Sequence, residues 1–390
     1  MRMLLLGAGR QGKAVLHDLI HSPDVQSVTC AEVDLPALKT YLAAIKAEKV
    51  EPVALDASDP KALRALMARG FDVAIDMLPR QFIRNIGQAA VDCRLHLVNT
   101  YYDHDLRDLA DAAEEASVSL LPEMGMDPGI DLVLCGEAVR RLDQVTRLVS
   151  YGGGFPEPPA IDNPLKYKIT WTWEGVLNSY VRDAVIVQDG RETSVPGSEI
   201  FSDRFTHTVN VPDLGELEAF PNGNATAYAH KLGIADTVRV SGRYALRWPG
   251  HCRLWHALKQ LGFLDETPVP GLPGNVTPRQ FMVKHLEPRL QYKDSERDID
   301  LIRVEAEGLR NSRRVQLVMQ VLDYRDMATG LTAMSRTVGF PAAIAARMIA
   351  DGTIRRRGLL SPTADVPYQP FIDELRARNI TVTEQETATE

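Results

Sequence analysis

The sequence predicts an α/β protein in two parts: a doubly wound parallel sheet, then a second α/β domain that carries a mixed or antiparallel sheet. Two patterns support this prediction. Between residues 1 and 125, short apolar runs alternate with longer segments of helical periodicity, and strands that alternate with helices form parallel sheets. After Asp131, runs of alternating apolar and polar residues are separated by turns, which is typical of antiparallel or mixed pairing. A chain of 390 residues is too long for one core and suits two or three domains.

The first part contains the parallel strands. We expect them at residues 2–7, 25–34, 50–58, 71–79, 95–102 and 118–124. Helical segments separate them, and right-handed crossovers through such helices bring successive strands into one sheet. Strands in this number and arrangement complete a Rossmann-type fold, which binds dinucleotides. We therefore predict a Rossmann-type NAD(P)-binding domain over residues 1–130.

The second part is predicted to be an α/β domain over residues 131–337. Its expected strands lie at 145–153, 166–173, 183–190, 236–246, 298–308 and 314–324. Helical segments follow in the tail, and we expect the helices of residues 338–390 to pack back on the first domain. The closing "TEQETATE" is polar and is expected to fray.

Composition and charge argue against several classes of protein. Hydrophobic residues make up 45% and charged residues 25% of the chain, as in ordinary globular proteins. The formal net charge of -8 comes without a basic stripe, which argues against nucleic acid as a partner. No apolar run reaches the roughly 18 residues of a membrane span, and the chain enters a strand at once, without a cleavable leader. We therefore expect a cytoplasmic protein without a membrane partner.

Metal and disulfide chemistry are not expected. The cysteines are scattered without a C-x-x-C pair, and His251 and His256 do not share one helical face as a metal pair requires. The cysteines are expected to be reduced and mostly buried: Cys30, Cys93, Cys135 and Cys252.

A G-x-G-x-x-G motif lies between the first strand and its helix, in "LLLGAGRQGKAV". Gly7 allows the tight turn, Gly9 lets the backbone approach a pyrophosphate, and Gly12 allows the helix to pack closely. The helix that starts at Arg10 and Gln11 stabilises the anion with its N-terminus. The alternative is a glycine cluster that serves the turn alone. The position between strand and helix favours dinucleotide binding, so these five residues are predicted to contact the cofactor.

Carboxylates at the ends of the next two strands bear on the form of the cofactor. Glu32 ends the second strand, with Asp34 two residues further on. A carboxylate there accepts hydrogen bonds from the adenosine ribose and repels a 2′-phosphate, which favours NAD over NADP. Two alternatives stay open: Glu32 caps the next helix, or Arg10 reaches a 2′-phosphate. Asp56, at the end of the third strand, either faces adenine or supports the helix that follows.

The tips of the later strands are predicted to surround the nicotinamide ring, because ligands bind at the carboxyl ends of strands in open α/β sheets. The predicted contacts come from "MLP", "NTYY" and "GMDPG" and are Leu78, Pro79, Thr100 and Gly125. Asp127, just before a proline, can cap the next helix or take a proton from an amine. Both roles stay open.

Several segments, in order along the chain, carry a resemblance to a known family. They are "GMDPGIDL", "VSYGGGFPEP", "DNPLKYKITWTWEGVL", "YALRWPGH", "LQYKDSERDIDLI" and "AMSRTVGFPAAIAARMIADGTIRRRGLLSP". They resemble the saccharopine dehydrogenase family, specifically its L-glutamate-forming reductase branch and the relative L-lysine 6-dehydrogenase. The resemblance implies NAD(P)-dependent oxidation at the CH–NH group of a small amino-acid substrate in lysine metabolism, followed by hydrolysis of the imine. It also implies that the second domain carries the substrate site and the interface of a homodimer.

The resemblance further implies site residues. Positions that match Tyr102 and Asp127 lie beside the reacting carbon and the nicotinamide, and the position that matches Trp171 lines the substrate cleft. A tyrosine hydroxyl can donate or accept a hydrogen bond, and a carboxylate stabilises a protonated amine. The candidates to bind the substrate are Lys168, Asn222, His230, Lys231 and Arg247. For the basic residues among them, the alternative is that they form ion pairs at the protein surface.

Departures from the family pattern bear on the substrate. The family's "SYCGGLP" reads "SYGGGFP", so Gly152 replaces a cysteine, and "PNRDS" reads "PNGNA", so Gly223 replaces an arginine expected to clamp a substrate carboxylate. A long reductase segment between "GFLDE" and "TPRQF" is nearly absent. Three interpretations remain: a saccharopine dehydrogenase, an L-lysine 6-dehydrogenase or related diamine or opine-type dehydrogenase, and a non-catalytic NAD(P)-sensing protein.

Overall fold

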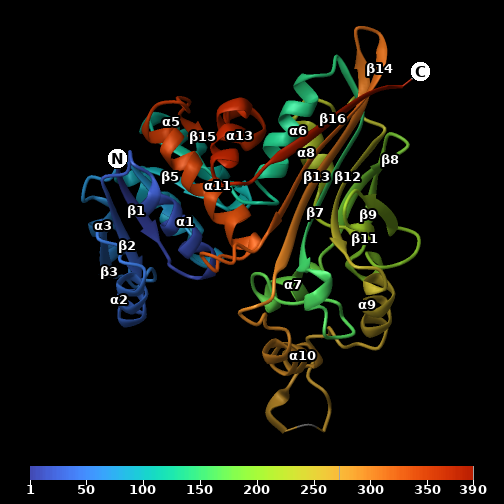
Figure 1. The fold of residues 1–390 in the computed structure, drawn as a ribbon, viewed down its shortest axis with the longest axis horizontal. Helices are drawn as coiled ribbons and strands as arrows, with labels where there is room; N and C mark the ends of the chain where they lie inside the picture. Colours follow the sequence, from blue (N-terminus) through green and yellow to red (C-terminus); the bar gives the residue numbers. More distant parts are fainter. Residues whose placement is uncertain (272, 390) are drawn as a thin grey trace. The chain divides into compact units, whose positions relative to one another are not determined.

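A computed structural model describes residues 1–271 and 273–389 (Figure 1). The chain forms two compact units. The first contains Met1–Glu137 and Ser335–Thr381, and the second contains Ala138–Met334 and Val382–Glu390. The chain passes from the first unit to the second within α6 (Ile130–Arg140). It returns to the first unit near the start of α11 (Ala333–Ala350).

The first unit is built on a seven-stranded sheet in the order β15-β6-β5-β4-β1-β2-β3, in which every neighbouring pair is parallel. The strands are β1 (Arg2–Leu6), β2 (Ser27–Glu32), β3 (Val50–Ala54), β4 (Val73–Asp76), β5 (His96–Asn99), β6 (Ser119–Leu121) and β15 (Gly358–Leu359). The predicted α/β fold with a Rossmann-type parallel sheet is confirmed. The prediction did not include β15, because two paired residues are too few to show a period.

Helices pack on this sheet. They are α1 (Arg10–His21), α2 (Leu35–Ala44), α3 (Pro60–Met67), α4 (Ile83–Asp92), α5 (Ala110–Glu115), α11, α12 (Pro362–Asp365) and α13 (Tyr368–Ala377). One apolar cluster joins the strands to α3, α4 and α5 through residues such as Leu66, Ile86 and Ala113. Helix α11 crosses α1 closely, since a Cβ on Gly339 would lie 2.7 Å from Ala14 Cβ. The segment Ser335–Thr381 therefore completes the first unit.

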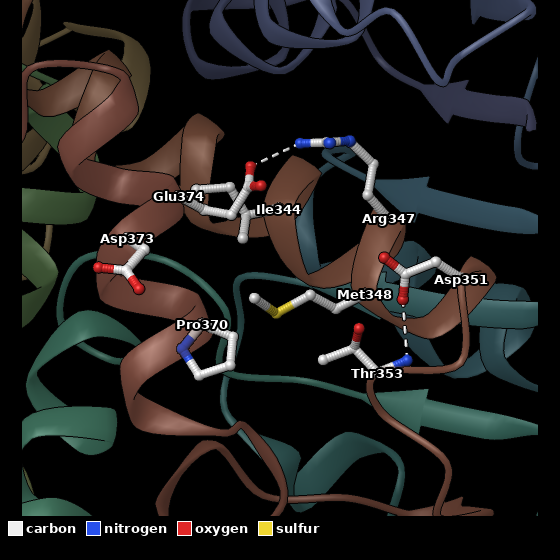
Figure 2. A pocket seen from close by; sticks show the side chains of 8 residues that line it. All are labelled: Ile344, Arg347, Met348, Asp351, Thr353, Pro370, Asp373 and Glu374. Atoms are coloured by element: carbon white, nitrogen blue, oxygen red, sulfur yellow. Dashed lines mark hydrogen bonds and ion pairs between the residues drawn. The ribbon is translucent and has the colours of Figure 1, made fainter.

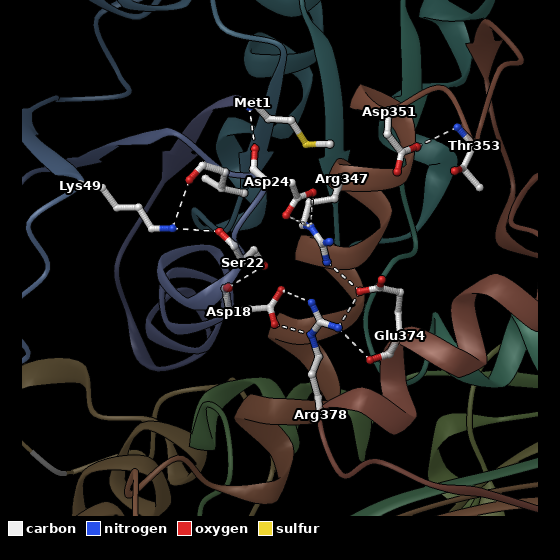
Figure 3. A network of polar contacts seen from close by, with 11 residues as sticks. Met1, Asp18, Ser22, Asp24, Lys49, Arg347, Asp351, Thr353, Glu374 and Arg378 are labelled. Atoms are coloured by element: carbon white, nitrogen blue, oxygen red, sulfur yellow. Dashed lines mark hydrogen bonds and ion pairs between the residues drawn. The ribbon is translucent and has the colours of Figure 1, made fainter.

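Ion pairs, most of them half-buried, hold this C-terminal segment to α1 and to the turn before β2 (Figure 3). Arg378 donates to Asp18 of α1 at 3.0 Å and to Glu374 of α13 at 2.7 Å. Arg347 of α11 donates to the same Glu374 at 2.7 Å and to Asp24 at 2.9 Å. Asp18 is only 6% exposed, and burial raises the pKa of its carboxyl against the lowering effect of Arg378. Asp18 therefore depends on Arg378 to stay charged inside the unit.

Arg378→Met is expected to lower the free energy of unfolding by about 3 kcal/mol, because it leaves a buried carboxylate without its ion pair. Urea denaturation measures the change. Arg376→Met is the matched control: Arg376 pairs with Asp373 at the surface, and exposed pairs contribute about 0 to 1 kcal/mol. Equal losses in the two variants would contradict this account of the network.

The second unit is built on a nine-stranded mixed sheet with the path β10-β11-β12-β7-β13-β14-β16, to which β8 and β9 add beside β12. The strands are β7 (Gln144–Pro156), β8 (Ala184–Gln188), β9 (Arg191–Val195), β10 (His207–Val211), β11 (Gly215–Pro221), β12 (Val240–Arg247), β13 (Asp298–Arg310), β14 (Arg313–Tyr324) and β16 (Val382–Thr389). The β12–β7 pair is parallel and the other pairs are antiparallel. The prediction of a mixed or antiparallel second sheet is confirmed.

Helices and an aromatic core support this second sheet. Besides the end of α6, the helices are α7 (Trp173–Ser179), α8 (Ala225–Lys231), α9 (His251–Gln260) and α10 (Pro278–Leu286). Trp173 and Trp255 lie at the centre of the core with ring centroids 6.0 Å apart, and Tyr180 stacks edge-on against Trp255 at 4.9 Å. Short 3-10 turns among the described residues are η1 (Arg80–Phe82), η2 (Asp103–Asp105), η3 (Arg107–Leu109), η4 (Pro158–Ala160), η5 (Gly197–Glu199), η6 (Pro273–Asn275) and η7 (Glu287–Arg289).

Two expectations about local structure are wrong. Residues 166–173 form no strand, and α7 begins at Trp173. Tyr167 and Ile169 are buried, as a strand pattern suggests, but their burial comes from packing into the aromatic core. The end of the chain neither frays nor packs as a helix on the first unit, because Val382–Thr389 forms β16 against β14. Its polar residues stabilise the edge strand through ion pairs such as Arg141 with Glu384 at 2.6 Å.

Candidate functional site

The turn between β1 and α1 has the backbone geometry that a pyrophosphate needs. Gly7 has a φ of +92°, and a Cβ on Gly12 would lie 2.2 Å from Gly7 O. A Cβ on Gly9 would meet no atom within 4 Å among the described residues. The turn therefore requires glycine at the first and third positions for its own packing, while the second position is open to a ligand.

The N-terminus of α1 faces this open position without a cap. Arg10 is the first residue of α1, Gln11 is the second, and no described side chain caps the helix. In contrast, Asp34 and Asp59 cap α2 and α3. Uncapped backbone N–H groups and the helix dipole together favour an anion. The residues present therefore fit the pyrophosphate of a dinucleotide.

Glu32, at the end of β2, lies against the glycine-rich turn. Its Oε2 accepts from Ala8 N at 2.8 Å and its Oε1 from Val33 N at 2.9 Å. This places the carboxylate where the adenosine ribose of a bound dinucleotide is expected. The alternative role of Glu32 as a helix cap is wrong, because Asp34 caps α2 by accepting from Ala37 N at 2.9 Å.

Asp56 follows β3 and forms a turn of its own. Its Oδ1 accepts from Ser58 N at 2.9 Å and from Ser58 Oγ at 2.6 Å. Asp59, not Asp56, caps α3. Asp56 thus lies exposed after its strand, and its contact with adenine stays a prediction.

The ends of β1, β4 and β5 lie side by side, since Leu6, Asp76 and Asn99 are register partners. A Cβ on Gly7 would lie 3.1 Å from Leu78 Cδ2, and a Cβ on Gly125 would lie 3.3 Å from Thr100 Cβ. The structure thus brings several predicted cofactor residues to one edge of the sheet: Gly7, Leu78, Pro79, Thr100 and Gly125.

Two residues at this edge were not predicted. Asp76 Oδ1 accepts from Leu78 N at 2.9 Å and Asn99 Oδ1 accepts from Tyr101 N at 3.1 Å. Their remaining atoms, Asp76 Oδ2 and Asn99 Nδ2, are buried without a hydrogen-bond partner among the described residues. Burial raises the pKa of Asp76 to about 7. The sequence signal was a polar residue at the end of each apolar run, but turn formation explains such residues equally well.

Asp76→Asn is expected to stabilise the protein at pH 8 by about 2 kcal/mol. The folded-state pKa of about 7 exceeds the ordinary 3.8, so stability falls as the pH rises between these values, by about 4 kcal/mol in total. The new amide leaves a buried donor that costs about 1 to 3 kcal/mol. Urea denaturation at pH 4 and pH 8 measures the effect, and an unchanged pH dependence of stability would contradict it.

The "GMDPG" motif folds into a tight loop between β6 and α6. Gly125 N donates to Pro128 O at 2.9 Å. A Cβ on Gly129, whose φ is +150°, would lie 1.9 Å from Gly125 O, so no side chain fits there. Asp127 is half-buried within this loop. Glycine and proline are therefore needed to build the loop that carries Asp127.

Tyr102 lies half-buried after β5. Its ring centroid is 6.3 Å from that of His104, in a stacked arrangement. Because β5 and β6 are parallel neighbours, the segments that follow them leave the sheet at the same edge, so Tyr102 and Asp127 follow neighbouring strands. Their catalytic roles stay predictions.

In the second unit, two predicted substrate residues have protein partners. Lys168 is 1% exposed and donates to Asp162 at 2.9 Å and Glu296 at 2.7 Å. Asn222 Oδ1 accepts from Arg182 at 2.6 Å. Lys168 is thus held in ion pairs, whereas Asn222 lies beside Arg182, which was not among the predicted site residues.

The tryptophans and the two unusual glycines differ in environment. Trp171 is 43% exposed, whereas Trp173 is 1% exposed and belongs to the core. Gly152 lies within β7, paired on both sides. Gly223 has a φ of +87° and its carbonyl accepts from Val185 N at 2.9 Å. Trp171 therefore remains available to a substrate, while His230 and Lys231 are exposed at the end of α8.

Arg247, at the end of β12, is a buried cation. It is 7% exposed and donates to Leu246 O at 2.7 Å, and its guanidinium carbon lies 5.0 Å from the Tyr167 ring centroid. No acidic residue in the described part of the chain forms an ion pair with it, and its Nε has no hydrogen-bond partner there. A buried charge without a counterion is costly, so Arg247 fits an anionic ligand better than the other candidates do.

A separate pocket of about 310 Å³ lies beside α11 and α13 in the first unit (Figure 2). Its lining residues are Ile344, Arg347, Met348, Asp351, Thr353, Pro370, Asp373 and Glu374. Arg347 and Glu374 bind each other, and Asp351 accepts from Thr353 N at 2.8 Å. None of the predicted site residues lines this pocket.

Within residues 1–271 and 273–389, none of the helices combines the length and apolar character needed to traverse a bilayer. The same residues contain no group of three or more His, Cys, Asp or Glu side chains arranged to hold a metal ion. The cysteines are free.

Comparisons with known proteins find matches over almost the whole chain. Residues 3–121 match the family model described as saccharopine dehydrogenase NADP binding domain, and residues 125–380 match saccharopine dehydrogenase C-terminal domain. The saccharopine dehydrogenase [NADP(+), L-glutamate-forming] of Saccharomyces cerevisiae is 27% identical over 96% of each chain. The mitochondrial alpha-aminoadipic semialdehyde synthase of Bos taurus is 25% identical over 99% of this chain. The chain spans 48% of that relative's length.

Solved structures agree on the fold. Apo saccharopine dehydrogenase (L-Glu forming) from Saccharomyces cerevisiae superposes with a TM-score of 0.87 at 24% identity, over 99% of this chain and 100% of that one. Homospermidine synthase from Legionella pneumophila, solved with NAD, gives 0.67 at 13% identity, over 99% and 91%. The names of the family model and of the fungal relatives favour NADP, whereas Glu32 alone had favoured NAD.

Proposed function

The chain belongs to the saccharopine dehydrogenase family, and from that membership we propose that it is a nicotinamide-dependent oxidoreductase that oxidises the CH–NH group of saccharopine and yields L-glutamate. The observation that carries the proposal is the match to fungal saccharopine dehydrogenases over 96% of both chains. The dinucleotide-binding geometry of the first unit supports it, because the glycine-rich turn and the uncapped α1 fit the cofactor. The second α/β unit is proposed to bind the substrate.

The proposed reaction assigns separate roles to the side chains of Asp127, Tyr102, Arg247 and Trp171. The glycine-rich turn and the N-terminus of α1 would hold the dinucleotide, which would supply the hydride acceptor for the carbon that carries the substrate nitrogen. Asp127 accepts a proton from the substrate amine, and Tyr102 orients the amine by a hydrogen bond. Arg247 holds a substrate carboxylate, which supplies the counterion that its buried guanidinium lacks. Trp171 covers the substrate, and water completes the hydrolysis of the imine.

The form of the cofactor rests on two opposing observations. Relatives named as NADP(+) enzymes and an NADP-binding family model support NADP, which is the form we propose. Glu32 is expected to weaken that preference, because its carboxylate lies where a 2′-phosphate would approach. Its two oxygens already accept backbone N–H bonds, which offset part of the repulsion.

Glu32→Gln is expected to raise the ratio of kcat/KM with NADP to kcat/KM with NAD by about tenfold, since it removes a negative charge close to the 2′-phosphate. Steady-state kinetics with both cofactors at fixed ionic strength measure the ratio. Asp56→Asn serves as the control for a charge change at the same edge of the sheet. A ratio that did not rise in Glu32→Gln would show that another residue sets the preference.

The substrate is tested by initial rates of NADPH or NADH formation with saccharopine and with lysine in parallel. We expect turnover of saccharopine. Gly223, where an arginine was expected, favours a second candidate, L-lysine 6-dehydrogenase or a related diamine or opine-type enzyme, which would turn over lysine alone. A non-catalytic sensor would gain thermal stability from NADPH yet oxidise neither amine. The predicted homodimer and cytoplasmic location stay predictions.

A further inference from the structure

Arg247 lies next to a buried pair of residues, Tyr180 and His251. The Tyr180 hydroxyl lies 2.8 Å from His251 Nε2, and it also interacts with the Arg247 guanidinium. Tyr180 is 0% and His251 3% exposed. Tyr180 directly follows α7 and His251 is the first residue of α9, so two separate elements meet beside Arg247, the last residue of β12.

The partners of His251 fix the direction of these hydrogen bonds. Nδ1 lies 3.5 Å from Leu165 O, which can only accept, so Nδ1 carries the proton and Nε2 accepts from the Tyr180 hydroxyl. The Tyr180 oxygen can then accept from the Arg247 guanidinium. Burial and the charge of Arg247 lower the pKa of His251 well below its usual value, which keeps the ring neutral. The nearby Glu218 is bound to Gly250 N and Cys252 N at 2.8 Å, at the start of α9.

A second hydrogen-bond donor near Arg247, the Tyr292 hydroxyl, also indicates a ligand. The Tyr292 hydroxyl is buried without a hydrogen-bond partner among the described residues, as is Arg247 Nε. Tyr292 interacts electrostatically with Arg247, and burial raises the pKa of its phenol well above 10, so it keeps its proton. The Nε of a guanidinium and a hydroxyl group, each without an acceptor among the described residues, make a site for a carboxylate.

We infer that Tyr180 and His251 are positioning residues, which hold the Arg247 guanidinium in the orientation that binds a substrate carboxylate together with the Tyr292 hydroxyl. The inference rests on the proposed function, because it assigns Arg247 to a carboxylate of that substrate. The neutral His251 anchors Tyr180, and Tyr180 fixes one edge of the guanidinium. Nε, which has no hydrogen-bond partner among the described residues, is left for the ligand.

The test measures binding of L-glutamate to the full chain with NADP by titration calorimetry, in the wild type and in variants of the pair. Tyr180→Phe keeps the ring and removes the hydroxyl, and we expect its Kd for L-glutamate to rise about tenfold. His251→Leu should have the same effect. His251→Gln should recover most of the affinity, because its amide oxygen can accept from Tyr180. Tyr151→Phe is the matched control, since it breaks another tyrosine–histidine bond, to His207 at 3.1 Å.

Kinetics separate positioning from a general structural role. With saccharopine, Tyr180→Phe should raise KM about tenfold and leave kcat and the KM for the cofactor within about threefold. A wild type that binds no L-glutamate, or a Tyr180→Phe protein that binds it as tightly as the wild type, would overturn the inference. If Tyr180→Phe does not fold, equal affinities of His251→Leu and His251→Gln would overturn it. Intact L-glutamate binding without saccharopine turnover would contradict the proposed function alone.

Discussion

Gly12→Ala is expected to abolish cofactor binding at millimolar concentration and to lower the free energy of unfolding by about 2 to 3 kcal/mol. The added Cβ would lie 2.2 Å from Gly7 O, a backbone atom that cannot rotate away, so α1 must shift from the turn. That shift moves the helix N-terminus from the position where it stabilises the pyrophosphate. Fluorescence titration with NADPH and urea denaturation measure the two effects.

Gly9→Ala is the matched control for Gly12→Ala. Its Cβ meets no described atom within 4 Å, so the free energy of unfolding should stay within about 0.5 kcal/mol of the wild type. The same methyl group occupies the space assigned to the pyrophosphate, so NADPH affinity should still fall at least about tenfold. Unchanged affinity in Gly9→Ala would place the cofactor elsewhere.

Asp127→Asn is expected to lower kcat with saccharopine about a thousandfold, within the range of about 10² to 10⁴ for the loss of a general base. The amide keeps the size of the side chain, so the "GMDPG" loop and the affinity for NADPH should be preserved. Stopped-flow measurement of the first turnover isolates the chemical step from product release.

The pH profile of Asp127→Asn distinguishes catalysis from helix capping. If Asp127 is the general base, the pH profile of kcat in the wild type should contain an acidic limb, and the variant should lose that limb. An asparagine caps a helix about as well as aspartate. A variant that keeps the full rate across the profile would reduce Asp127 to a structural residue of the loop.

The first unit was predictable because its elements are local. The strands β1 to β6 are short apolar runs, and the sequence shows a helical period in the segments between them. The strand β15 was not predictable, because it pairs only two residues with a distant strand. The ion pairs of Arg378 and Arg347 were not predictable either, because they join residues that are hundreds of positions apart in the sequence. Sequence patterns report local periodicity and carry no signal for such long-range contacts.

The second unit shows where alternation misleads. Residues 166–173 alternate like a strand, yet Tyr167 and Ile169 are buried by an aromatic core. Residues 383–389 look polar and loose, yet they form most of β16, because arginines of distant elements pair with their glutamates. In both cases tertiary packing decides the structure against the local composition.

The candidate site divides in the same way. The glycine-rich turn, Glu32 and the "GMDPG" loop were found from sequence because backbone geometry imposes their residue types. Asp76 and Asn99 were missed because only the register of β4 with β5 brings them together. Arg247 was one of several basic candidates, and burial together with the absence of an acidic partner in the described part of the chain distinguishes it. The Tyr180–His251 pair depends on the convergence of α7 and α9, which sequence spacing does not encode.

The most direct test of the account is the identity and amount of the products that wild-type protein forms from saccharopine. Quantitative mass spectrometry should detect L-glutamate and reduced cofactor in equal amounts, with NADP or NAD as the oxidant. That result would establish oxidation at the lysine-derived carbon of the CH–NH group, so that hydrolysis of the imine leaves the nitrogen on L-glutamate. Reduced cofactor formed from lysine but not from saccharopine, or saccharopine consumed without L-glutamate, would contradict the proposed function.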